Sequence, residues 1–156
     1  MAVVAALLLA LVSGGRSAVC HGITDNILCV PLPHGWHGSV GFGGPRSQPS
    51  AWIVAGNFKL AGREGGSPVP PHRTKIVIGD FPATGVGWRK VRRLRLPVRL
   101  PAQHTVQMGA SYWSVTRRVR YARRDIIVTA VFGSRPDPRL RALANARLAA
   151  VHRLGR

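Results

Sequence analysis

The sequence predicts an α+β domain in which a mainly antiparallel sheet of about six strands is covered by a carboxy-terminal amphipathic helix. Three observations predict this class. Apolar and polar residues alternate over residues 113–121, as in a half-buried strand. A run rich in β-branched residues covers 126–132. Between Leu140 and Val151, apolar residues then recur at intervals of three and four, as on one face of a helix.

An apolar run from Ala2 to Val12 begins the chain, and three small residues follow it at 13–15. The run has the length of the hydrophobic part of a signal peptide and is shorter than the ~20 residues that span a bilayer. We therefore predict that residues 1–19 are a signal peptide or amino-terminal hydrophobic segment, and that residues 20–156 form a single secreted or envelope domain. Because no Lys or Arg precedes the run, a buried strand or helix of the domain is the alternative.

The two cysteines, Cys20 and Cys29, allow one intramolecular disulfide, which would close a short loop in an exported chain. In a cytosolic protein both would be free thiols. Together with His21, His34 and His37 they also supply the nitrogen and sulfur ligands that zinc and copper prefer, although their spacing matches no standard site. The alternative is that Trp36 enters the core while His34 and His37 flank it in solvent.

Further strands are predicted at residues 27–32, 51–58 and 74–81. Alternation places Trp52 and Val54 on one face of the second of these strands, and Ile76 and Ile78 on one face of the third. The segment 61–72 is rich in glycine and proline, so we expect an exposed excursion there.

Residues 91–100 alternate again, with leucine and valine on one side and arginine on the other, and Pro97 indicates an edge strand or a bulge. If this strand pairs with 113–121, five arginines would share one sheet face beside Tyr112: Arg93, Arg95, Arg99, Arg118 and Arg120. Arginines around an exposed aromatic residue suit the binding of a nucleic-acid backbone or another polyanion. An ordinary solvated strand face is the alternative.

Residues 122–125 are polar, which predicts a turn between the two strands. Within the first of these strands, Arg117 breaks the alternation, which indicates a bulge or an edge position. The helix begins either with a capping box of Ser134 and Asp137, or with Asp137 as N-cap and Pro138 at the first helical position. Arg153 would lie at the negative end of the helix dipole. The expected buried face is Leu140, Leu143, Ala144, Leu148 and Val151.

The chain carries 23 Lys and Arg but only 5 Asp and Glu, which gives a formal net charge of +18. Such a charge attracts nucleic acid, anionic lipid or acidic polymers. Nearly all of it is arginine, however, so the codon preference of a GC-rich genome explains it equally well. The acids are scattered, with no close pair for acid–base catalysis, and no nucleophile elbow, phosphate loop or dinucleotide motif is present. We therefore expect a non-enzymatic protein without a cofactor.

Four short segments occur in the order Pro33-His34-Gly35-Trp36, Gly56-Asn57-Phe58, Ile78-Gly79-Asp80-Phe81 and Leu143-Ala144-Asn145. In this order they resemble small exported proteins of uncharacterised function in high-GC bacteria. The early Pro-x-Gly-Trp is also similar to the PsbP/Mog1-like α+β sandwich. The resemblance implies export and an α+β fold, and it implies no particular activity.

The leading prediction is an exported or envelope-associated, non-enzymatic domain whose arginine-rich sheet face suits an anionic polymer or lipid surface. One alternative is a cytosolic nucleic-acid-binding protein, which requires that residues 1–15 are not a signal. The other is a metal-binding protein that uses His34 and His37.

Overall fold

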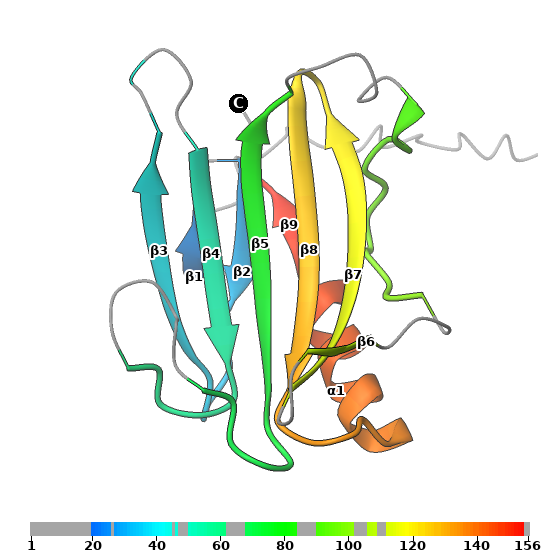
Figure 1. The fold of residues 1–156 in the computed structure, drawn as a ribbon. Helices are drawn as coiled ribbons and strands as arrows, with labels where there is room; N and C mark the ends of the chain where they lie inside the picture. The colour runs from blue at the N-terminus through cyan, green and yellow to red at the C-terminus, as the bar shows by residue number, and fades with distance from the viewer. Residues whose placement is uncertain are drawn as a thin grey trace, which may run out of the picture.

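The computed structural model describes residues 20–25, 27–44, 46, 50–61, 68–83, 90–101, 106–108 and 112–154. These residues form nine strands and one helix, arranged in two layers (Figure 1). The predicted α+β class, with antiparallel strands and a carboxy-terminal helix, is confirmed. The predicted signal peptide at residues 1–19 lies outside the described residues.

The first layer, the main sheet, is antiparallel and contains six strands of the described chain in the order β3-β4-β5-β8-β7-β6. Its strands are β3 (His37–Gly43), β4 (Ser50–Gly56), β5 (Thr74–Pro82), β6 (Val106–Met108), β7 (Tyr112–Tyr121) and β8 (Arg124–Phe132). The strands β4, β5, β8 and β7 correspond to the best-patterned segments of the sequence. Inward and outward side chains alternate along β4, β5 and β7, as the sequence predicts. The composition of 126–132 predicts a strand buried on both faces, but in β8 buried and half-buried residues alternate.

The second layer contains the helix α1 (Pro138–Ala149) and a small antiparallel sheet in the order β1-β2-β9. The three strands of this small sheet are β1 (Gly22–Thr24), β2 (Leu28–Pro31) and β9 (His152–Arg153). In Figure 1 the small sheet and the helix lie behind the main sheet. The sequence predicted one sheet covered by a helix, so the small sheet is an addition to the predicted architecture.

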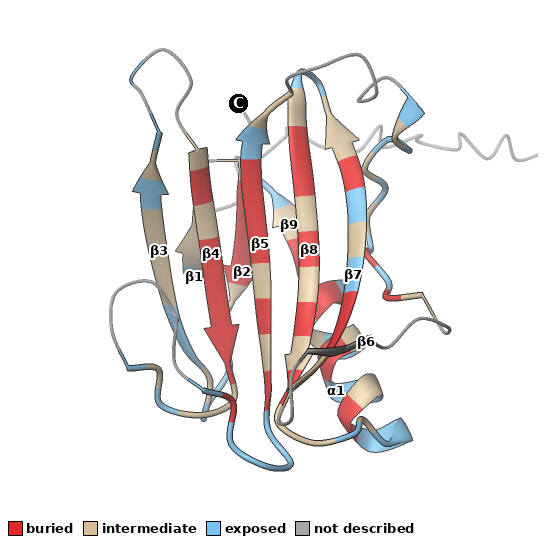
Figure 2. Cartoon of the chain, in the orientation of Figure 1, coloured by how far each residue is buried: buried red, intermediate tan, exposed pale blue. Residues whose placement is uncertain are grey.

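The hydrophobic core lies between the two layers (Figure 2). The main sheet contributes Ile53, Ile76, Ile78, Val115, Val119, Ile126, Val128 and Phe132. The second layer contributes Leu28, Val30, Leu140, Ala144, Leu148 and Val151. Because both layers bury side chains in this one cluster, each large residue contributes about 1.5–3 kcal/mol to holding them together.

The helix begins as the second of the two sequence alternatives predicted. Asp137 is the N-cap, its Oδ1 accepts a hydrogen bond from the Leu140 backbone N–H at 2.8 Å, and Pro138 follows in the first turn. Two predictions about its far end and face were wrong. Leu143 is 37% exposed, because it points away from the stripe that packs on the sheets. Arg153 lies in β9, beyond the helix end at Ala149.

The hairpin of β7 and β8 is paired without a break from Trp113↔Phe132 to Tyr121↔Arg124. Of the two alternatives that the sequence offered at Arg117, the bulge is absent from these two described strands, and the edge position fits, because β6 pairs only with residues 112–114 of β7. Arg117 stays on the inner face opposite Val128, and its guanidinium reaches the carbonyl of Arg99 at 2.7 Å. The turn is two residues shorter than predicted, because Arg124 already belongs to β8.

Residues 91–100 do not form the predicted edge strand. Their pairing with β7 is one parallel bridge, Arg93↔Arg120, with the Leu94 N–H donating to the Arg120 carbonyl at 2.7 Å. Beyond this bridge the segment makes no further strand pairing among the described residues, contains a cis peptide bond before Pro97, and buries Val98 in the core. The Leu100 N–H then donates to the side chain of Asn145 in the helix at 3.0 Å. The alternation of residues 91–100 reflects an extended segment packed over an edge of the core rather than a strand.

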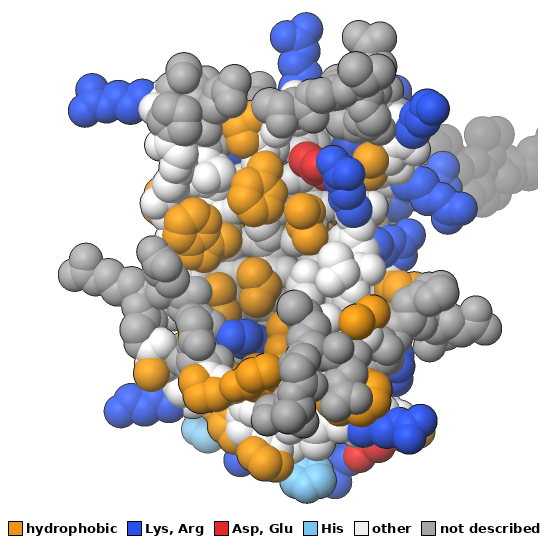
Figure 3. Space-filling model, in the orientation of Figure 1, with side chains coloured by type: hydrophobic (Ala, Val, Ile, Leu, Met, Phe, Trp, Pro, Cys, Tyr) orange, Lys and Arg blue, Asp and Glu red, His pale blue; other side chains and the backbone are white. Residues whose placement is uncertain are grey.

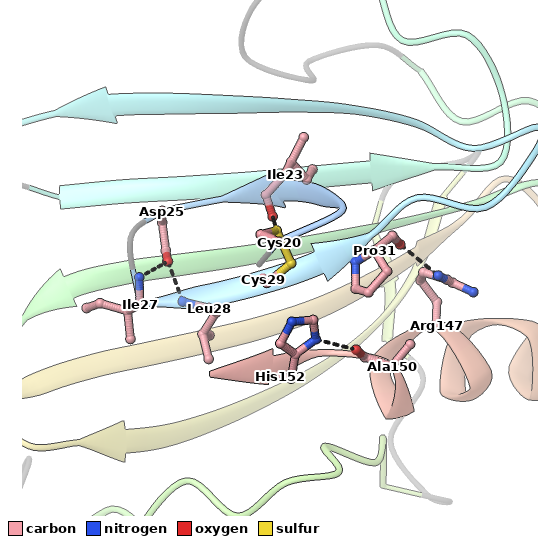
Figure 4. The surroundings of a disulfide bond; sticks show 10 residues. All are labelled: Cys20, Ile23, Asp25, Ile27, Leu28, Cys29, Pro31, Arg147, Ala150 and His152. Carbon is pink, nitrogen blue, oxygen red and sulfur yellow. Dashed lines mark hydrogen bonds between the residues drawn. A yellow bond between two sulfur atoms is a disulfide. The ribbon is translucent and has the colours of Figure 1, made fainter. Parts of the chain in front are cut away.

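A disulfide joins Cys20 to Cys29 of β2, with 5.6 Å between their Cα atoms (Figure 4). It ties the residues before β1 to the central strand of the small sheet. Within the described part of the chain, no helix is long and apolar enough to cross a bilayer.

Candidate functional site

The face of the main sheet that is turned away from the second layer, here called the outer face, carries an aromatic and aliphatic patch. One row of paired residues crosses five strands in the order Gly41, Trp52, Gly79, Ile127 and Arg118. The row therefore changes from glycine and aromatic residues at β3 and β4 to a cation at β7. Hydrophobic side chains gather on this face in Figure 3, with a charged group beside them.

Glycines on this face leave room for the aromatic rings. A Cβ atom at Gly41 would lie 2.1 Å from Nε1 of Trp52, and one at Gly79 would lie 2.4 Å from the ring of Phe81. The indole and the phenyl ring thus lie flat against the backbone of neighbouring positions. Between them is a shallow groove of about 370 Å³, lined also by Val54, Val77, Ile127 and Thr129.

One of the five predicted anion-binding arginines, Arg118, pairs with Ile127 of the groove lining, and two more follow it toward the edge of the sheet. Arg118 and Arg120 alternate onto the outer face of β7, and the parallel bridge places Arg93 beside Arg120. Arg118 binds the carboxylate of Asp125 through its Nε at 2.8 and 2.9 Å, and this hydrogen bonding raises its pKa. Its Nη2 also donates to Asp125, while the side chain as a whole is 52% exposed, so one edge of the guanidinium is engaged and the rest of the side chain faces solvent.

The other two predicted arginines lie farther along residues 90–101. Arg95 and Arg99 are exposed, and this part of the segment makes no strand pairing among the described residues. The Nε of Arg120 donates to the carbonyl of Val91 at 2.7 Å, so this arginine also holds the segment in place. The five arginines therefore follow one edge of the main sheet rather than forming the single face that strand pairing would have given.

The structure leaves the alternative metal-binding hypothesis without its cysteine ligands. Cys20 and Cys29 are disulfide-bonded, so neither offers a thiolate. His34 is exposed in the turn before β3 and His37 is exposed at the start of that strand. Within the described residues, no three His, Cys, Asp or Glu side chains come close enough to hold one metal ion. Trp36 is half-buried against the core. The Cζ atom of Arg147 lies 5.4 Å from the centroid of the Trp36 ring.

A second cavity, here called the acid pocket, lies between the layers and has a volume of about 400 Å³. It brings together Asp25 from the β1–β2 turn, Asp80 from β5 and Arg124 from β8. The sequence predicted no close pair of acids, and this was wrong. Asp25 and Asp80 are 55 positions apart in the printed sequence, so only the stacking of the small sheet on the main sheet brings them together.

Both acids of this pocket are almost completely buried, Asp25 at 5% and Asp80 at 1% exposure. The Nε of Arg124 donates to Oδ1 of Asp80 at 2.7 Å. Burial raises the pKa of Asp80, the hydrogen bond and charge of Arg124 oppose that rise, and the negative charge of Asp25 adds to it. The two carboxylates are therefore close enough to interact.

Comparison of the chain with protein-family models, with curated proteins and with solved structures finds no match. The candidate sites are accordingly defined by their geometry and charge alone.

Proposed function

We propose that this protein is an exported or envelope-associated, non-enzymatic domain that binds an anionic lipid surface with the outer face of its main sheet. The observation that carries the proposal is the cross-strand row that passes from Trp52 through Ile127 to Arg118. Aromatic rings suit the interface of a bilayer, where their apolar bodies face the acyl chains. Arginines beside them suit the phosphate groups of the lipids.

The combination favours a lipid surface over a soluble acidic polymer. A polymer needs cations alone, whereas this face places a groove of apolar residues next to them. The chain also carries a net charge of +18, which draws it toward any negatively charged membrane. The disulfide between Cys20 and Cys29 supports export, because such bonds persist in oxidising compartments.

Sedimentation with vesicles tests the arginine edge. Changing Arg93, Arg95 and Arg99 to Gln should weaken binding to phosphatidylglycerol vesicles by roughly 100-fold, since each arginine near such a surface contributes about 1 kcal/mol. The matched control changes Arg46, Arg73 and Arg139 to Gln, which removes the same charge from exposed positions on other elements. This control should lose far less. Equal losses in the two triple variants would show that net charge alone causes the binding.

The apolar part of the face has its own test. The double change Trp52→Ala and Phe81→Ala should leave binding at low salt but abolish it at high salt, because salt screens the charges and not the apolar contacts. Thermal unfolding of the variant verifies that it is folded. If the unchanged protein binds duplex DNA at physiological salt but does not bind the vesicles, the lipid proposal fails and the nucleic-acid alternative takes its place.

A further inference from the structure

The acid pocket holds an unbalanced negative charge inside a strongly basic protein. Its charged lining residues are Asp25, Asp80 and Arg124, and the single cation among them is engaged with Asp80. Arg124 also donates to the backbone carbonyl of Asp80 at 3.3 Å. With both acids ionised, these three side chains sum to one negative charge.

Asp25 is the residue that carries this excess. Its Oδ1 accepts hydrogen bonds from the backbone N–H groups of Ile27 at 2.9 Å and Leu28 at 2.8 Å, which closes the turn before β2 (Figure 4). Its Oδ2 is buried and has no hydrogen-bond partner among the described residues. A buried carboxylate oxygen without a partner destabilises a folded protein, so a donor that reaches this oxygen from the pocket would stabilise the fold.

We propose that the acid pocket binds a small ligand that carries a positively charged amine on an apolar body. The ammonium would donate to the free oxygen of Asp25, and Ser50 and Tyr121, which both carry hydroxyl groups, are among the residues that line the same cavity. Ile27, Phe42 and Leu154 supply apolar walls for the rest of the molecule. The volume of about 400 Å³ is in the range of small-molecule sites.

An ammonium suits this site better than a metal ion does. Arg124 already occupies one carboxylate oxygen of Asp80, and two backbone N–H groups occupy one oxygen of Asp25. Too few oxygens are left to surround a calcium or magnesium ion, which takes six or more ligands. An ammonium needs only about three acceptors. This inference does not depend on the lipid-binding proposal, because the pocket lies on the inner side of the main sheet.

The test uses three probes with the same ring and different charge: 2-phenylethylamine, 2-phenylethanol and phenylacetate. Each is titrated into the full chain labelled with ¹⁵N and followed by NMR. The amine should shift the backbone amides of Ile27 and Leu28 and bind at least about tenfold more tightly than the alcohol. Phenylacetate should not bind. Absence of these amide shifts, or equal affinity for amine and alcohol, would overturn the proposal.

The variant Asp25→Asn tests the residue itself. The Asn side-chain oxygen can still accept from Ile27 and Leu28, so the turn is kept while the charge is removed. Amine binding should fall by about tenfold and the preference over the alcohol should disappear. The control Asp137→Asn removes a charge outside the pocket and should change nothing, because Asn is also a good N-cap. Unchanged amine binding in Asp25→Asn refutes the proposal; if that variant does not fold, the comparison of amine and alcohol in the unchanged protein decides.

Discussion

The carboxyl group of Asp80 lies on the inner face of β5 and is almost fully shielded from water. Burial is the main cause of its raised pKa, and the hydrogen bond from Arg124 only partly offsets this effect. The folded protein therefore holds the proton of Asp80 more tightly than the unfolded chain does. By linkage, ionisation of Asp80 lowers stability as the pH rises.

This linkage gives a prediction for the variant Asp80→Asn. Between the unfolded-state pKa of about 3.9 and the raised folded-state pKa, the free energy of unfolding of the unchanged protein should fall with rising pH relative to that of the variant. Below this window the difference between the free energies of unfolding of the two proteins should be constant. The measurement is urea unfolding of both proteins across the acid range. A gap between them that moves in the opposite direction would mean that Arg124 outweighs burial.

Single residues also show what the sequence could and could not reveal. The orientation of Trp52, Ile76 and Ile78 was predictable because alternate side chains of a strand must point to opposite faces. The proximity of Asp25 to Asp80 was not predictable, because no local sequence pattern indicates which turn packs over which strand. The sequence also could not predict that Oδ2 of Asp25 lacks a hydrogen-bond partner, since this depends on the positions of all the donors around it.

Among the elements, α1 depends on a cap that the sequence left between two alternatives. The variant Asp137→Ala should lower the free energy of unfolding by about 1 kcal/mol, because the Leu140 N–H loses its acceptor. Ser134 offers a matched control: its hydroxyl accepts from the His72 N–H at 3.3 Å on the surface and does not cap the helix. Ser134→Ala should therefore cost less, as chemical denaturation can establish. The reverse order would restore the capping-box interpretation.

The elements that the sequence predicted well are those whose partners are close in the chain. The strands β7 and β8 form a hairpin, and α1 follows them at once. The failures involve distant partners or misleading alternation. The strand β9 has only two residues and exists because it pairs with Leu28 and Cys29. Residues 91–100 alternate like a strand, yet their backbone pairs with β7 only at the bridge Arg93↔Arg120, and the Leu100 N–H donates to Asn145 of α1 instead.

At the scale of the whole molecule, the two layers share one core, so a substitution that destabilises one layer should also destabilise the other. Replacing Cys20 and Cys29 with Ala should lower the free energy of unfolding by about 2–3 kcal/mol, the cost expected for freeing a short loop. Urea unfolding monitored by fluorescence and by circular dichroism should still show one transition. Two separate transitions would mean that the small sheet unfolds independently of the main sheet.

The pairing of β9 with β2 also orders events in time. Leu28 and Cys29 lie near the start of the domain and His152 and Arg153 near its end, so β2 lacks one neighbour in any folding intermediate in which the last residues have not yet docked. In such an intermediate, the backbone groups of β2 that await β9 form an exposed edge to which a strand from another chain can add.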